Sequence, residues 1–113
     1  MHIYKSMFCD DVCQGKRKKI IRKIKYHAGL TSTYVIALAN GNDYFDLIPG
    51  YVLKQKAYPI KDLHIIGLAD GYDSAVILVI KMIGVFFEKY GTYQFKDFLM
   101  QEKEMNFTGY NRK

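Results

Sequence analysis

The sequence predicts a small domain of the α/β (or α+β) class with a βαβα order of elements. Two short runs, 33–39 and 62–69, are rich in β-branched and aromatic residues, as buried strands are. A longer apolar run with helical spacing, residues 74–89, follows the second of them. We therefore expect two layers, in which a few-stranded sheet is packed by one long apolar helix, with a basic helix nearer the N-terminus.

Length and composition limit the chain to a single domain, 1–113. Half of its 113 residues are apolar and only two are proline, which excludes a disordered tail and a multidomain enzyme. The residues after Met1 lack the long apolar stretch of a signal peptide, so we expect a cytoplasmic protein.

The basic helix is predicted over residues 16–29. Isoleucines recur there at helical spacing with the charges opposite, and Gly29 is a typical helix stop. Ile24, Tyr26 and Ala28 also alternate, so a strand in the second half of the segment remains an alternative.

The region between the two predicted strands is ambiguous. Asn40 and Gly41 form a hairpin signal directly after the first strand. Residues 43–56 repeat apolar side chains at helical spacing, but Pro49 and Gly50 interrupt the pattern. We expect a short or kinked helix there, with a strand ending at position 48 as the alternative.

The long helix, 74–89, is the strongest element, and Gly91 ends it. It is apolar almost all round, so we expect it to be buried against the sheet on one side. The other side would meet the segment 93–101 or a second subunit, and Val79→Glu or Ile83→Glu should abolish folding or association. A membrane span is disfavoured because the apolar stretch is short and contains a lysine.

The remaining segments complete the predicted domain. The crossover between the two strands is long enough to join parallel neighbours. Because two strands are too few for a stable sheet, residues 2–8 of the N-terminal segment 1–15 could supply a third, edge strand, and a dimer that extends the sheet is the alternative. The α/β core spans 30–101, with a last short helix after Thr92, and residues 102–113 form a flexible tail.

The positive charge of the chain lies almost entirely in the basic helix. The net charge is +6, and seven of the ten residues 16–25 are basic. Such a segment attracts nucleic-acid phosphates, acidic membranes or acidic protein patches, although a solvated helix face is the common alternative. The candidate nucleic-acid-binding residues are Lys16, Arg17, Lys18, Lys19, Arg22, Lys23, Lys25 and Tyr26. Exposed tyrosines stack on single-stranded bases, but they also suit protein interfaces or the rim of a small core.

A second candidate site is the turn between the second strand and the long helix. Glycines before a helix N-terminus offer free backbone N–H groups to an anion, and ligands gather at the carboxyl ends of strands. The candidate ligand-binding residues are Gly67, Asp70, Gly71, Tyr72, Asp73 and Ser74. The two aspartates would repel a phosphate but could hold a divalent cation, and an ordinary structural turn is the alternative.

Other polar residues do not form a recognised catalytic pattern. His64 lies in an apolar strand and is expected to be a core histidine bonded to backbone. Cys9 and Cys13 are four residues apart, a spacing that suits neither a disulfide nor a zinc site. We therefore predict no catalytic residues, no metal and no cofactor.

The run 62–75, followed by an apolar helix and Phe95-Lys96-Asp97-Phe98-Leu99, resembles a family of small uncharacterised proteins of Firmicutes-type bacteria. The bias toward Ile, Lys, Tyr and Asn is similar to that of their AT-rich genomes. The resemblance covers the last two thirds of the chain and implies no activity, cofactor or site residue.

Three classes of function follow. The first is a non-enzymatic interaction or regulatory module that acts as a homodimer and meets a protein partner. The second is an accessory protein that binds nucleic acid through residues 16–25. The third is a site for a small anionic ligand at residues 67–74, which would need a pocket of roughly 300 Å³ or more. A membrane partner is not expected.

Overall fold

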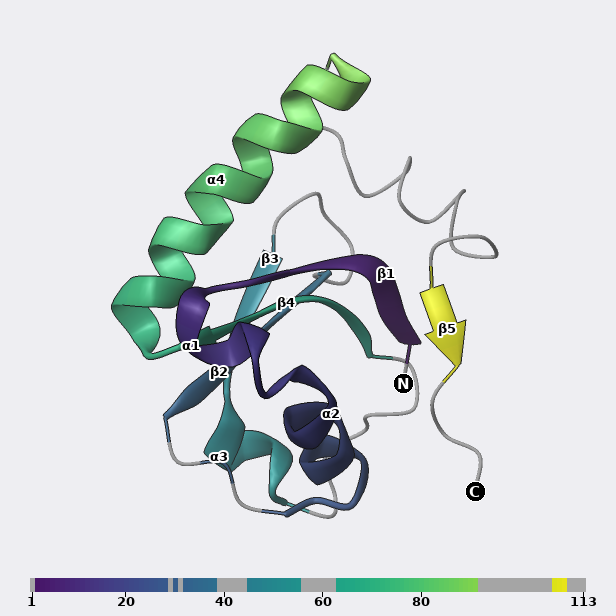
Figure 1. Ribbon diagram of the computed structural model, residues 1–113, viewed down its shortest axis with the longest axis vertical. Helices are drawn as coiled ribbons and strands as arrows, with labels where there is room; N and C mark the ends of the chain where they lie inside the picture. Colours follow the sequence, from purple (N-terminus) through teal and green to yellow (C-terminus); the bar gives the residue numbers. More distant parts are fainter. Residues whose placement is uncertain are drawn as a thin grey trace.

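The computed structural model describes residues 2–28, 30, 32–38, 45–55, 63–91 and 107–109. Within them the chain forms a five-stranded mixed sheet of order β3-β2-β4-β1-β5, together with four helices (Figure 1). The strands are β1 (His2–Cys9), β2 (Thr33–Leu38), β3 (Phe45–Pro49), β4 (His64–Asp70) and β5 (Phe107–Gly109). The helices are α1 (Asp11–Gln14), α2 (Arg17–Lys25), α3 (Gly50–Leu53) and α4 (Tyr72–Tyr90). The predicted α/β or α+β class is confirmed.

The two predicted strands, β2 and β4, form the centre of the sheet because both of their faces are apolar. Val35, Ile36, Ile65 and Ile66 have no exposed surface. The prediction that these strands run parallel is wrong, since they pair antiparallel. In the chain, β3 lies between β2 and β4 and pairs antiparallel with β2. The parallel pair is instead β1 with β4.

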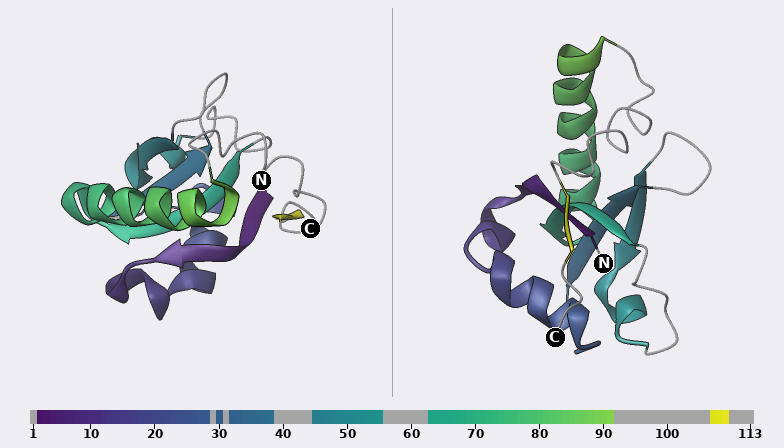
Figure 2. Two further views of the ribbon diagram at one scale, coloured as in Figure 1. Left: turned by 90° about the horizontal axis from the view of Figure 1, so that it is seen from above. Right: turned by 90° about the vertical axis from the view of Figure 1, so that its right-hand side faces the viewer.

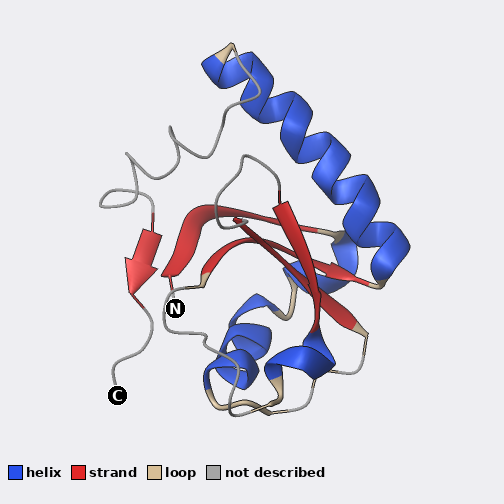
Figure 3. Cartoon of the chain, turned by 180° about the vertical axis from the view of Figure 1, so that it is seen from behind, coloured by secondary structure: helices blue, strands red, loops and turns tan. Residues whose placement is uncertain are grey.

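The sheet is covered on both faces, so the domain has three layers where the sequence predicts two. On one face α4 packs through Ala75, Leu78, Met82 and Phe86. On the other face Cys13 of α1, three isoleucines of α2 and Leu53 of α3 form a second cluster. Figures 2 and 3 show the strands between the long helix and the group of shorter ones. The additional layer exists because α2 is amphipathic and buries its isoleucine stripe.

Residues 45–49 follow the strand alternative, and the expected helix is confined to residues 50–53. β3 lies at the edge of the sheet, where Pro49 can end a strand without removing a needed ladder hydrogen bond. Phe45 and Leu47 pack on the α4 side, whereas Ile48 packs on the other side, which is the period of a strand. The helical spacing is satisfied only by the single turn of α3.

The prediction of the long helix is confirmed, since α4 runs from Tyr72 to Tyr90. It ends at Gly91, whose φ of 69° is the left-handed C-cap that glycine adopts at low cost. Among the helices of the described part, none has the length and apolar character needed to cross a bilayer. The short helix predicted after Thr92 lies outside the described residues.

Two segments near the chain ends complete the sheet. β1 pairs with β4 on one side and with β5 on the other, so it is not at the edge. The three residues of β5 lie within the segment expected to be a flexible tail.

The pairing register of β4 with its two neighbours shifts near Gly67. Ile65 and Leu68 face the same cluster although they are three residues apart, so the strand is bulged between them. A Cβ atom at Gly67 would lie 3.1 Å from the carbonyl oxygen of Phe8 on β1. The glycine therefore serves the close approach of two strands.

Candidate nucleic-acid interface around helix α2

Helix α2 separates its side chains into an apolar inner face and a basic outer face. Ile20, Ile21 and Ile24 are at most 4% exposed and pack toward the sheet. Among the basic side chains, four are exposed, namely Lys16, Lys18, Lys19 and Arg22. Arg17, Lys23 and Lys25 are half-buried. We call the seven predicted basic residues the α2 surface: Lys16, Arg17, Lys18, Lys19, Arg22, Lys23 and Lys25.

Tyr26 stands at the carboxyl end of this surface and is 66% exposed. The Lys25 ammonium lies 5.4 Å from the centre of its ring, within the range of a cation–π contact. The next residue, His27, has a φ of 55°, and its Nδ1 lies 2.9 Å from the Leu53 carbonyl oxygen. This bond ties the end of α2 to α3.

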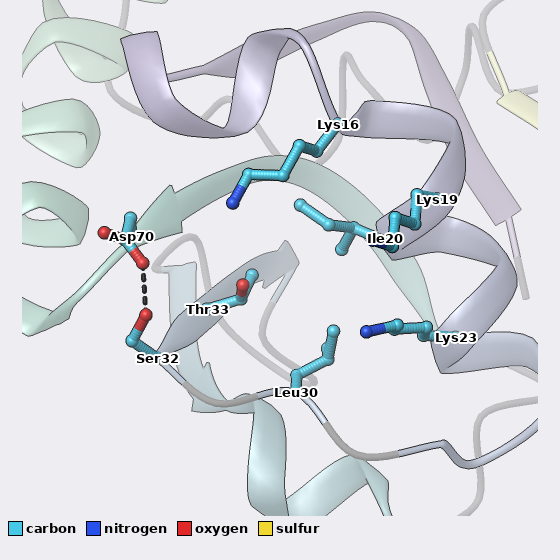
Figure 4. Close-up of a pocket in the computed structure, with 8 residues that line it drawn as sticks. All are labelled: Lys16, Lys19, Ile20, Lys23, Leu30, Ser32, Thr33 and Asp70. Atoms are coloured by element: carbon cyan, nitrogen blue, oxygen red, sulfur yellow. Dashed lines mark hydrogen bonds between the residues drawn. The ribbon is translucent and has the colours of Figure 1, made fainter.

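A cavity of about 120 Å³ lies between α2 and the start of β2 (Figure 4). Lys16, Lys19 and Lys23 line one wall, because positions three and four apart share a helix face. Figure 4 shows the Lys16 and Lys23 ammonium groups directed into the space. The hydroxyls of Ser32 and Thr33 contribute to the opposite wall, with Asp70 at one end. Three cations against one carboxylate leave the cavity positive.

A shallower depression surrounds the N-terminus of α2. It is lined by Gln14, Gly15, Lys16, Arg17, Lys18, Lys19 and Arg22. Lys16 is the N-cap and provides no side-chain cap, and the first turn contains no acidic residue. Positive side chains therefore add to the positive end of the helix dipole. The depression shares Lys16 and Lys19 with the cavity, so the two form one basic surface.

A hydrogen-bonded network holds the ends of β1 and β4 beside the cavity. One carboxylate oxygen of Asp10 accepts from the Cys13 backbone N–H at 2.8 Å, and the other accepts from the Asp70 N–H at 2.7 Å. Ser32 donates its hydroxyl proton to the Asp70 carboxylate. The Ser32 carbonyl accepts from the Gly71 N–H at 2.8 Å. These bonds fix the position of Ser32 in the cavity wall.

Burial opposes ionisation of Asp10, but the donated N–H bonds from Asp70 and Cys13 outweigh it and lower the pKa of the carboxyl group below 3.8. Burial also raises the pKa of Cys9, and burial with the nearby Asp10 charge raises the pKa of Cys13 to about 12. Both cysteines are free thiols. The raised pKa values favour the protonated thiol of both cysteines at neutral pH.

The structure does not gather the residues of the predicted turn into one site. Gly67 is buried in the middle of the sheet, and Tyr72 and Asp73 are exposed on α4. Asp70 alone among the six lines the cavity. The cavity at Asp70 is smaller than the ~300 Å³ that a drug-sized ligand requires, so it suits a small group such as a phosphate.

His64 is half-buried and stacks on His2, with ring centroids 4.6 Å apart.

Ser32 and Thr33 line the cavity but were not predicted as site residues from the sequence. Their hydroxyls become relevant only when β2 is placed against α2. The signal in the sequence was their position at the start of a buried strand, where side chains can face a helix end.

The known proteins give no further guidance. Comparisons with protein families, curated proteins and solved structures found no match for this chain. The assignment of function therefore depends on the geometry of the α2 surface.

Proposed function

We propose that the protein binds single-stranded nucleic acid through the α2 surface. The observation that carries the proposal is the group of cations that lines the cavity and the depression beside α2, with Tyr26 exposed at the carboxyl end of the helix. Cations along a helix face neutralise successive phosphates, and an exposed aromatic ring stacks on an unpaired base. Duplexes hide their bases from such a ring, so Tyr26 favours a single strand.

The cavity gives this surface a position for one phosphate group. Lys16 and Lys23 would supply the charge, and the Thr33 hydroxyl would donate a hydrogen bond to one of its oxygens. Asp70 already accepts from Ser32, so its charge is partly compensated on that side. The backbone of a bound strand would continue over the depression at the N-terminus of α2.

The proposal is tested by fluorescence anisotropy with a labelled single strand of about 20 nucleotides and the matching duplex, at several salt concentrations. We expect binding of the single strand near physiological salt, weakening with salt as phosphate contacts do. Lys18→Glu should weaken it several-fold and reduce the log–log salt slope by about 0.7 or more. Lys89→Glu makes the same charge change on the opposite layer and should have little effect.

Tyr26→Ala separates base stacking from simple charge attraction. Removing a stacking ring should weaken single-strand binding about 5- to 150-fold and leave duplex binding unchanged. Tyr72→Ala is the matched control, since Tyr72 is 56% exposed but lies on α4. Absence of binding at physiological salt would refute the proposal. Equal binding to anionic vesicles, insensitive to Tyr26→Ala, would reassign the α2 surface to membranes.

A further inference from the structure

The cavity between α2 and the start of β2 is closed toward the core of the domain. Its lining includes Ile20 and Leu30, which are 4% and 8% exposed and belong to the core cluster on this side of the sheet. A group that occupies the cavity therefore enters from the solvent side. A phosphate at the end of a strand enters with one ester-linked sugar left outside, whereas an internal phosphate has to turn two such sugars back toward solvent.

The charges that line the cavity also distinguish the two kinds of phosphate. Lys16, Lys19 and Lys23 contribute three positive charges and Asp70 one negative charge, so the lining has an excess of two positive charges. An internal phosphodiester carries one negative charge. A terminal phosphate monoester carries about 1.5 to 2 negative charges near neutral pH, because its second pKa is about 6. The monoester is therefore the closer electrostatic match.

The sheet places a hydroxyl donor beside these cations. Thr33 and Asp70 are paired positions of β2 and β4, so the ladder fixes one against the other. The Asp70 carboxylate accepts from the Ser32 hydroxyl, and this bond directs part of its charge away from the cavity. Figure 4 shows the side chains of Lys16, Lys23 and Thr33 around one space. A monoester presents three terminal oxygens to such a set of donors, one more than a diester does.

We propose that the cavity binds the terminal phosphate monoester of a nucleic-acid strand, and that the strand leaves the cavity across the depression at the N-terminus of α2. The cavity and the depression share Lys16 and Lys19, so the two sites are continuous. This assignment rests on the proposed binding of single strands and adds a preference for a phosphorylated end.

Fluorescence anisotropy with three single strands of about 10 nucleotides tests the preference. The strands have one sequence and an internal label, and carry a 5′-phosphate, a 3′-phosphate or hydroxyls at both ends. One of the two phosphorylated strands should bind about tenfold or more tightly than the hydroxyl strand near physiological salt. Adenosine monophosphate is the competitor that distinguishes a strand end from a free nucleotide. It should displace the strand only at far higher concentration, and displacement at equal concentration would overturn the assignment to a strand.

A matched pair of variants tests the place of the terminal phosphate. Lys23 lines the cavity and Lys18 lines the depression. Lys23→Gln should abolish the preference for the phosphorylated end, as should Thr33→Val, which replaces the hydroxyl by a methyl group in a strand. Lys18→Gln should weaken all three strands equally and keep the preference.

The outcomes separate this proposal from single-strand binding itself. Equal affinities of the three strands would overturn the terminal-phosphate assignment while leaving single-strand binding in place. A preference that survives both Lys23→Gln and Thr33→Val would also overturn it, because the phosphate would then lie outside the cavity. Failure of all three strands to bind would overturn both proposals.

Discussion

At the scale of single residues, Gly50 shows how closely α3 approaches the start of β2. A Cβ atom there would lie 2.6 Å from the Leu30 Cβ atom and 2.9 Å from the Thr33 carbonyl oxygen. Gly50→Ala should therefore lower the free energy of unfolding by about 1–3 kcal/mol, as overpacking does. Gly15→Ala is the control, because nothing lies within 4 Å of its Cβ position. Urea denaturation measures both, and equal stability of the two variants would contradict the close contact.

Asp10 gives a pH dependence with a definite sign. Its pKa is lower in the folded chain than the ordinary 3.8, so the stabilisation is complete above that pH and is lost as pH falls through the folded value. Asp10→Asn keeps one acceptor but presents an NH₂ group to the other N–H donor, and should cost about 1–2 kcal/mol at neutral pH. The variant should also lose stability less steeply in acid, as chemical denaturation at several pH values would show. Asp11→Asn, an equal charge change one position along, is the control, and the same acid profile for both variants would exclude this role of Asp10.

At the scale of elements, α2 has a charge arrangement that opposes its own stability. Its first turn contains cations and no acidic residue, next to the positive end of the helix dipole. Lys18→Glu should therefore stabilise the fold by about 0.5–1 kcal/mol while weakening nucleic-acid binding. Lys89→Glu, in the last turn of α4, should destabilise it instead. Thermal melts of the two variants would show opposite shifts, and a lower melting temperature for Lys18→Glu would contradict the argument.

The elements also show what a sequence can and cannot predict. α2 and α4 were predictable because their apolar residues repeat with the helical period and glycine ends α4. Residues 45–49 fitted the helical period too, and only their pairing with β2 selected the strand. The parallel β1–β4 pair and β5 join distant segments, which no local pattern encodes.

The candidate site, like the fold, could be predicted from the sequence only in part. The cations of α2 are contiguous in sequence, so their common surface follows from the helix alone. Ser32, Thr33 and Asp70 reach the cavity only through the sheet topology, and the volume of the cavity depends on how closely α2 packs. Of the predicted turn, only Asp70 lines the cavity, and Gly67 lies at the bulge of β4.

At the scale of the whole molecule, the two clusters should unfold together. They lie on opposite faces of the sheet but share β2 and β4, since each of these strands contributes residues to both clusters. Ile24→Val and Ile66→Val, one in each cluster, should each cost about 0.5–1.5 kcal/mol and add in the double variant. Circular dichroism and tyrosine fluorescence should report one transition, and separate midpoints would show that the layers unfold independently.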